Sequence, residues 1–193
     1  HGHPVCDEAT IEAYRAALAE GPYTAGVAVG AGTINDIVKF ATYQQGLPAA
    51  CVGTAPSMNG YTSKIAAILS DGVKTTNPCH APLVVIADLE VMAQAPARMI
   101  ASGLGDLISK PVSNSDWQLS AHLNGTPHSA EAMAVIERGA ELLEDVAPRL
   151  QHEDTEAMAG LVGSLILSGL AMSIAGSSSP ASGGEHLISH YID

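Results

Sequence analysis

The chain has 193 residues, of which 20 are Asp or Glu and only 8 are Lys or Arg, so its formal net charge is −12. Hydrophobic residues make up 47% of the chain, which excludes disorder caused by low hydrophobicity. So acidic a chain is a poor ligand for phosphate backbones and anionic membrane surfaces, and we expect no nucleic-acid binding. The length suits one domain or two small ones.

The cysteines and the most apolar segment bear on the cellular compartment. Cys6, Cys51 and Cys79 stand far apart and form neither a disulfide framework nor a CxxC metal site. We therefore expect reduced thiols in a cytoplasmic protein, and we find no signal-peptide pattern. Residues 161–175 are shorter than the ~20 residues of a bilayer span, so we interpret them as a buried core helix and expect no membrane span.

Strands and helices are predicted to alternate in the first half of the chain. Short apolar runs predict strands at residues 25–29, 49–52 and 83–87. Apolar residues at helical spacing predict a helix over residues 34–45. This order implies parallel pairing of the strands, so residues 1–95 are expected to form an α/β part with a parallel sheet.

The second half of the chain is predicted to be almost entirely helical. Residues 176–184 are rich in Ser, Gly and Pro and predict a loop, after which a last helix begins near residue 184. The other predicted helices are 97–108, 116–123, 130–146 and 155–174. The expected organisation is therefore an α/β part over residues 1–95 and an all-helical part over residues 96–193.

A glycine-rich turn follows the first predicted strand, in the sequence Gly30-Ala31-Gly32-Thr33-Ile34-Asn35-Asp36. Glycines let a phosphate approach the backbone, and the start of a helix supplies unpaired N–H donors. The third glycine of the GxGxxG fingerprint is absent. A tight strand-to-helix turn with Thr33 as N-cap explains the same residues, so both interpretations stay open.

Hydroxyl groups gather in the loop over residues 54–63, at Thr54, Ser57, Thr62 and Ser63. The loop follows a strand end, where open α/β sheets bind ligands, although a hydroxyl-rich surface loop would have the same composition.

Asp106 closes the sequence Gly103-Leu104-Gly105-Asp106. Among apolar neighbours its carboxylate needs a cation, hydrogen-bond donors or water, unless it faces solvent at a helix kink.

His186 and His190 are four residues apart and would share one face of the last helix. This spacing suits two metal ligands, or one ligand and one substrate contact. Two surface histidines would show the same spacing.

Taken together, five stretches resemble the sn-glycerol-1-phosphate dehydrogenases, which belong to a wider group with glycerol dehydrogenase, iron-containing alcohol dehydrogenases and dehydroquinate synthase. The stretches are residues 30–36, 54–63, 103–106, 115–117 and 180–190. The resemblance covers essentially the whole chain, and the loop at 54–63 and the segment at 180–190 are its most specific parts. It implies a nucleotide-binding α/β domain, a helical domain and an active site in the cleft between them.

The resemblance also implies cofactors and site residues. The cofactors would be NAD or NADP and one divalent metal ion, Zn²⁺ or Ni²⁺. Asp106 and His186 would be metal ligands, Asn59, Asp106 and His190 would contact substrate, and Asp106 and His190 would be catalytic. The dinucleotide would be bound by Gly30, Gly32, Thr33, Ile34, Asn35, Asp36, Thr54, Ala55, Pro56, Ser57 and Ser63.

The implied reaction is the reversible reduction of dihydroxyacetone phosphate, a phosphorylated triose, to sn-glycerol 1-phosphate. The low content of Lys and Arg keeps an unphosphorylated polyol open as the substrate, because a phosphate favours cationic partners. The candidate cations are Lys64, Lys74 and Lys110. We also expect a homo-oligomer.

Two departures from the family pattern support a third interpretation. Asn59 stands where the family normally has an acidic residue, so its side chain keeps an acceptor oxygen but loses the charge. The resemblance also implies that the chain is truncated at both ends, with a third metal ligand, a histidine, beyond residue 193. The chain could therefore be a non-catalytic fragment or a pseudoenzyme of the same fold.

Overall fold

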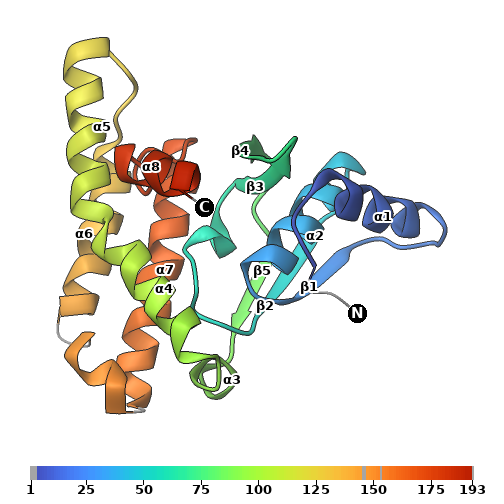
Figure 1. Ribbon diagram of the computed structural model, residues 1–193, viewed down its shortest axis with the longest axis horizontal. Helices are drawn as coiled ribbons and strands as arrows, with labels where there is room; N and C mark the ends of the chain where they lie inside the picture. Colours follow the sequence, from blue (N-terminus) through green and yellow to red (C-terminus); the bar gives the residue numbers. More distant parts are fainter. Residues whose placement is uncertain (1–3, 145–146, 153, 193) are drawn as a thin grey trace.

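The structure is a computed structural model that describes residues 4–144, 147–152 and 154–192. An α/β part and a group of helices lie side by side (Figure 1). In chain order the elements are α1 (Glu8–Ala19), β1 (Gly26–Gly30), α2 (Gly32–Gln44), β2 (Ala49–Gly53), η1 (Gly60–Thr62), β3 (Ile65–Ser70), β4 (Val73–Pro78), β5 (Val84–Ala87), α3 (Leu89–Ala93), α4 (Ala97–Ile108), α5 (Lys110–Asn124), α6 (Ala130–Glu144), η2 (Ala147–His152), α7 (Thr155–Ala175) and α8 (Gly184–Ile192).

The sheet has the order β1-β2-β5 and is parallel throughout, as predicted. Gly26 pairs with Ala49, and Ala50 pairs with Val84. Helix α2 covers one face of this sheet, where Val38 packs against Ala28 and Cys51 in a shared cluster. The carboxyl ends of β1 and β2 therefore deliver the glycine turn and the loop at 54–63 to the same edge of the sheet.

Three elements of the α/β part are absent from the sequence prediction: α1, α3 and the antiparallel hairpin β3–β4. Asp7 caps α1 by accepting a hydrogen bond from the backbone N–H of Thr10 at 2.8 Å. The hairpin turns at Asp71 and Gly72, which both have positive φ, at 52° and 78°. Figure 1 shows the hairpin between the sheet and α8.

The helical part follows the prediction closely, with two differences in length. Helix α5 starts six residues before the expected position, because Pro111 fits the first helical turn, where an N–H is not needed. The predicted helix at 130–146 is observed as α6 up to Glu144, and its last two residues lie outside the described ones.

Helix α7 is the core of the helical part. It packs along α6 and against α3 and α4, and ten of its residues are buried, among them Leu161 and Leu165. It has 21 residues, one more than the predicted helix at 155–174 and more than the apolar stretch at 161–175. Within the described part of the chain it is the one helix that is long and apolar enough to cross a membrane, by length and composition only. Its buried contacts confirm the interpretation as a core helix.

The loop at 54–63 contacts both parts. The alternative of a surface loop is wrong, because five of its ten residues are buried and none is exposed. It approaches two helix glycines so closely that a side chain at either would collide with it: Gly103 of α4 faces the Pro56 carbonyl, and Gly169 of α7 faces the Asn59 carbonyl. Ser173 also donates a hydrogen bond to the Thr62 carbonyl at 2.7 Å. The loop is thus held firmly on the helical part.

Candidate functional site

A cavity of about 450 Å³ lies where the α/β part, the hairpin and the helical part meet. Eight of the residues that the resemblance singled out line it: Gly32, Thr33, Asp36, Ser57, Asn59, Ser63, Asp106 and His186. The hairpin adds Lys74 and Thr76, and the helical part adds Met172 and Ser182. The structure therefore brings residues from four of the five stretches that carry the resemblance into one cleft.

The N-terminus of α2 forms the first wall of this cleft. Helix α2 begins at Gly32, its N-cap is Ala31, and no side chain caps it, so the alternative with Thr33 as N-cap is wrong. The first-turn N–H groups of a 13-residue helix are therefore available to a ligand, with the favourable end of the helix dipole behind them. A Cβ at Gly32 would lie 3.0 Å from Cγ of Met58, so the wall has room for little more than backbone. This cradle fits a dinucleotide pyrophosphate.

The other residues proposed for the dinucleotide lie behind the cavity rather than on its surface. Asn35, Ala55 and Pro56 are buried, and Ile34 packs against the core of the sheet. Gly30 accepts a hydrogen bond from the Thr54 N–H at 3.1 Å, which links the two loops. Their contribution to cofactor binding stays a prediction.

Lys39, which the sequence analysis missed, is a fully buried lysine beneath the loop. Its Nζ donates to the Gly60 carbonyl at 3.0 Å and to Ser63 Oγ at 3.3 Å, and it lies 3.3 Å from Asp36 Oδ1. Asp36 Oδ2 in turn accepts the Ala67 N–H at 3.0 Å. Lys39 thus holds the loop at 54–63 against α2. The sequence signal that could have indicated this role is a lysine placed between apolar positions of a predicted helix.

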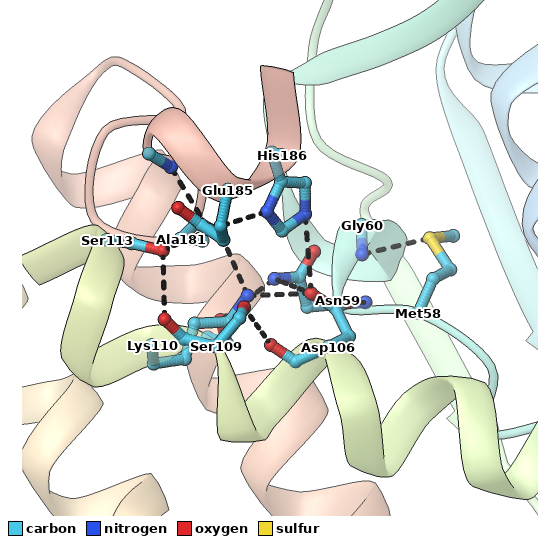
Figure 2. A network of polar contacts seen from close by, with 12 residues as sticks. Met58, Asn59, Gly60, Asp106, Ser109, Lys110, Ser113, Ala181, Glu185 and His186 are labelled. Carbon is cyan, nitrogen blue, oxygen red and sulfur yellow. Dashed lines mark hydrogen bonds and ion pairs between the residues drawn. The ribbon is translucent and has the colours of Figure 1, made fainter. Parts of the chain in front are cut away.

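Asp106 forms the centre of the second wall, and its charge is paired as the sequence required. Lys110 Nζ lies 2.6 Å from Oδ1, the Asn59 N–H donates to Oδ2 at 2.9 Å, and Asn59 Nδ2 donates to Oδ1 at 3.3 Å (Figure 2). The Asp106 side chain is 13% exposed, so a solvent-facing kink is wrong. Burial lowers the pKa of Lys110, and the neighbouring carboxylate of Asp106 opposes this shift.

His186 extends from α8 toward Asp106, and Figure 2 shows the two side chains facing each other. Nε2 of His186 lies 3.7 Å from Asp106 Oδ1, and Nδ1 lies 2.7 Å from Glu185 Oε1. Burial alone would raise the pKa of Glu185, but hydrogen bonds from Ser113, His186 and the Gly183 N–H outweigh it and lower the pKa to about 2. His190 belongs to α8, but its side chain lies outside what the structure describes.

A divalent metal ion fits between Asp106 and His186. A carboxylate oxygen and an imidazole nitrogen 3.7 Å apart can both reach one ion with bonds of about 2.0–2.2 Å. Among residues 4–144, 147–152 and 154–192, no group of three or more His, Cys, Asp or Glu side chains is placed to hold a metal. These two residues therefore supply part of a ligand set, and a complete site needs further donors.

Of the three lysines considered as phosphate partners, Lys74 alone lines the cavity. Lys110 is committed to Asp106 and to the Ala181 carbonyl, and Lys64 is exposed outside the cavity. The cleft thus offers one lysine side chain on its surface beside a helix N-terminus.

Comparison with known proteins identifies the class. Residues 2–96 match the family described as iron-containing alcohol dehydrogenase. The fold is similar to an iron-containing alcohol dehydrogenase from Corynebacterium glutamicum, with a TM-score of 0.79, 20% identity and coverage of 96% of this chain and 49% of that one. It is also similar to a probable glycerol dehydrogenase from Sinorhizobium meliloti, with a TM-score of 0.77, 24% identity and coverage of 90% and 52%. The first half of the chain is therefore similar in sequence to iron-containing alcohol dehydrogenases, and most of its length shares their fold.

The curated relatives that the chain matches carry a more particular name than the family model does. The chain is 42% identical over 167 residues to glycerol-1-phosphate dehydrogenase (NAD(P)+) from Bacillus licheniformis, covering 86% of this chain and 42% of the relative. It is 41% identical to the enzyme of the same name from Pyrococcus furiosus, covering 86% and 48%. The chain therefore spans less than half the length of these relatives.

Proposed function

We propose that the protein is an NAD(P)- and metal-dependent dehydrogenase that reversibly reduces dihydroxyacetone phosphate to sn-glycerol 1-phosphate in this cleft. The observation that carries the proposal is the convergence of an uncapped helix N-terminus with Asp106 and His186 on one cavity. The names of relatives with 41–42% identity support the substrate.

The α2 wall would hold the cofactor. The N–H groups of Gly32 and Thr33 would donate to the pyrophosphate, with Ser57 and Ser63 along the dinucleotide and the charge of Lys74 nearby. The bound nicotinamide would accept or supply the hydride. Lys39 would keep the loop in place from behind, and Asp36, which pairs with Lys39 and lines the cavity, would help to hold the pyrophosphate.

The opposite wall would hold the metal and the substrate. Asp106 and His186 would ligate a divalent ion, Zn²⁺ or Ni²⁺, which would polarise the substrate oxygens as a Lewis acid. The Asn59 amide nitrogen is committed to Asp106 and Ser168, which leaves its oxygen as an acceptor for a substrate hydroxyl. His190, one helical turn after His186, would contact the substrate and transfer a proton to or from it.

Two other functions remain as candidates, each with its own supporting observation. The single lysine on the cavity surface favours an unphosphorylated polyol as substrate. The incomplete ligand set among the described residues favours a non-catalytic chain of the same fold.

The test is the oxidation of NADH and NADPH by the full-length protein with dihydroxyacetone phosphate or dihydroxyacetone, alongside metal analysis. We expect turnover with the phosphorylated substrate and one bound divalent ion. A preference for dihydroxyacetone would favour the polyol. The absence of both bound metal and turnover would favour the non-catalytic chain.

The two histidines of α8 should differ in their roles. His186→Ala should lose metal and activity together, whereas His190→Ala should keep the metal and lose rate or substrate affinity.

We further propose that residues 1–95 and 96–193 belong to two domains and that the protein is a cytoplasmic homo-oligomer. The change from a parallel sheet to helices between β5 and α4 supports the boundary. Three free cysteines, of which Cys51 and Cys79 are buried, support a reducing compartment. Sedimentation of the full-length protein would test the oligomer.

A further inference from the structure

Three polar residues of α5 lie at a spacing of three and hold the segment that leads into α8. Lys110 Nζ donates to the Ala181 carbonyl at 2.8 Å. Ser113 Oγ donates to Glu185 Oε1 at 2.6 Å. Asp116, part of the stretch at 115–117 to which the resemblance gave no role, accepts the Gly184 N–H at 2.7 Å and so caps the start of α8. One face of α5 thus fixes the path of the chain just before His186.

Glu185 lies at the centre of this arrangement. Its Oε1 accepts three hydrogen bonds: from Ser113 Oγ at 2.6 Å, from His186 Nδ1 at 2.7 Å and from the Gly183 N–H at 3.2 Å. Figure 2 shows Glu185 between Ser113 and the ring of His186. A carboxylate can only accept, so Nδ1 of His186 must carry the ring proton when the ring is neutral. The lone pair then belongs to Nε2, the atom that faces Asp106.

The packing around Gly183 keeps this geometry tight. A Cβ at Gly183 would lie 2.7 Å from Glu185 Oε2, 2.7 Å from Asp116 Oδ2 and 2.9 Å from Ser113 Cα. The close approach of the segment to α5 therefore requires a residue without a side chain, and the Glu185 carboxylate has little room to leave its position.

We propose that Glu185, itself held by Ser113, is the positioning residue that fixes the tautomer and ring orientation of His186 and so presents Nε2 to a divalent metal. The metal half of this inference rests on the proposed function, whereas the tautomer half rests on the chain alone. Carboxylates that accept a hydrogen bond from the second ring N–H of a metal-binding histidine act in this way in other metalloproteins. Glu185 neither binds the metal nor touches the substrate in this arrangement.

The first measurement is the tautomer of His186 in metal-free, full-length protein by nitrogen-15 NMR. The wild type should show the proton on Nδ1, and Glu185→Ala should lose this preference because the acceptor is gone. Glu185→Gln keeps an acceptor oxygen and should retain most of it. Glu131→Ala, at an exposed first-turn glutamate of α6, is the matched control and should change nothing. An unchanged Nδ1–H in Glu185→Ala would overturn the proposal.

The second measurement is the dissociation constant of Co²⁺ for the same variants. Glu185→Ala should bind Co²⁺ about 10–100-fold more weakly, the usual cost of losing such a partner, and Glu185→Gln should recover most of the affinity. Wild-type affinity in Glu185→Ala, while His186→Ala loses binding, would overturn the positioning role. Equal binding by wild type and His186→Ala would instead overturn the metal site, and the tautomer of His186 would still decide the role of Glu185.

Ser113→Ala provides the test if Glu185→Ala does not fold. It should weaken the preference for a proton on Nδ1 of His186, because Ser113 holds Glu185. An unchanged preference in Ser113→Ala would count against the proposal.

Discussion

The two walls of the cleft are built in different ways. The α2 wall presents mainly backbone: an uncapped helix N-terminus, a glycine at the point of closest approach, and a buried lysine that supports the loop from behind. The opposite wall presents side chains that contact one another. Asp106 is at their centre: it contacts Lys110 and Asn59 and faces His186. Substitutions on the first wall should therefore act through shape and loop support, and those on the second through unpaired charges that couple to one another.

Asp106→Asn should have the largest effect, because it changes the wall formed by interacting side chains in two ways. It removes a proposed metal ligand, so turnover should be lost. It also leaves the buried ammonium of Lys110 without its partner, which should cost about 3–5 kcal/mol of stability in urea unfolding.

The double variant Asp106→Asn with Lys110→Met separates these two effects. It removes both charges, so most of the lost stability should return while turnover stays absent. If the loss of stability in the double variant equals the sum of the losses in Asp106→Asn and Lys110→Met, the two residues are not coupled.

Lys39→Met tests whether the backbone wall depends on its buried support. The substitution removes the ammonium that holds Gly60 and Ser63, and we expect a loss of about 3 kcal/mol with weaker cofactor binding. Lys64→Met, at an exposed lysine next to the same loop, is the control and should stay within about 0.5 kcal/mol of wild type. Similar values for both variants would mean that the loop stands without the brace.

Gly32→Val should have the smallest effect, confined to the cofactor. A branched side chain would press on Met58 and fill the approach to the helix N-terminus, so dinucleotide affinity should fall about tenfold, or 1.4 kcal/mol. Gly163→Ala in α7 is a matched control, since its Cβ meets only Leu142 at 3.8 Å. Fluorescence titration with NADH would measure both, and equal affinities would leave the turn with a structural role alone.

The elements that the sequence predicted well are those with a strong apolar pattern, which is either a continuous apolar run or apolar residues at helical spacing. The sheet strands, α2, α4, α6 and α7 begin within about two residues of the expected positions. The hairpin was missed although Asp71-Gly72 is a typical hairpin dipeptide, and α1 was missed although Asp7 is a good N-cap. In both cases the sequence contains a local signal, the turn dipeptide or the N-cap residue, but the prediction relied on the apolar pattern alone.

The residues of the site also fall into two groups, those that the sequence indicates and those that it does not. Asp106, His186 and the glycine turn were proposed because short motifs carry them. The expectation that the Asp106 carboxylate needs a cation, hydrogen-bond donors or water is confirmed, since Lys110 and Asn59 both contact it. Lys110 had been considered for phosphate rather than for this pair. The contact between Ser113 and Glu185 joins residues 72 positions apart, and no spacing in the sequence indicates such a pair. Contacts of this kind follow only from the packing of α5 against α8.

The site that we propose depends on Asp106 and His186 holding one divalent metal ion in the cleft. An anomalous X-ray diffraction map of the full-length protein, recorded at the absorption edge of its bound metal, tests it most directly. One peak should lie between Asp106 and His186, with Nε2 as the histidine donor and bonds of about 2.0–2.2 Å. A metal peak elsewhere in the protein, with Asp106 still paired only to Lys110 and Asn59, would contradict it.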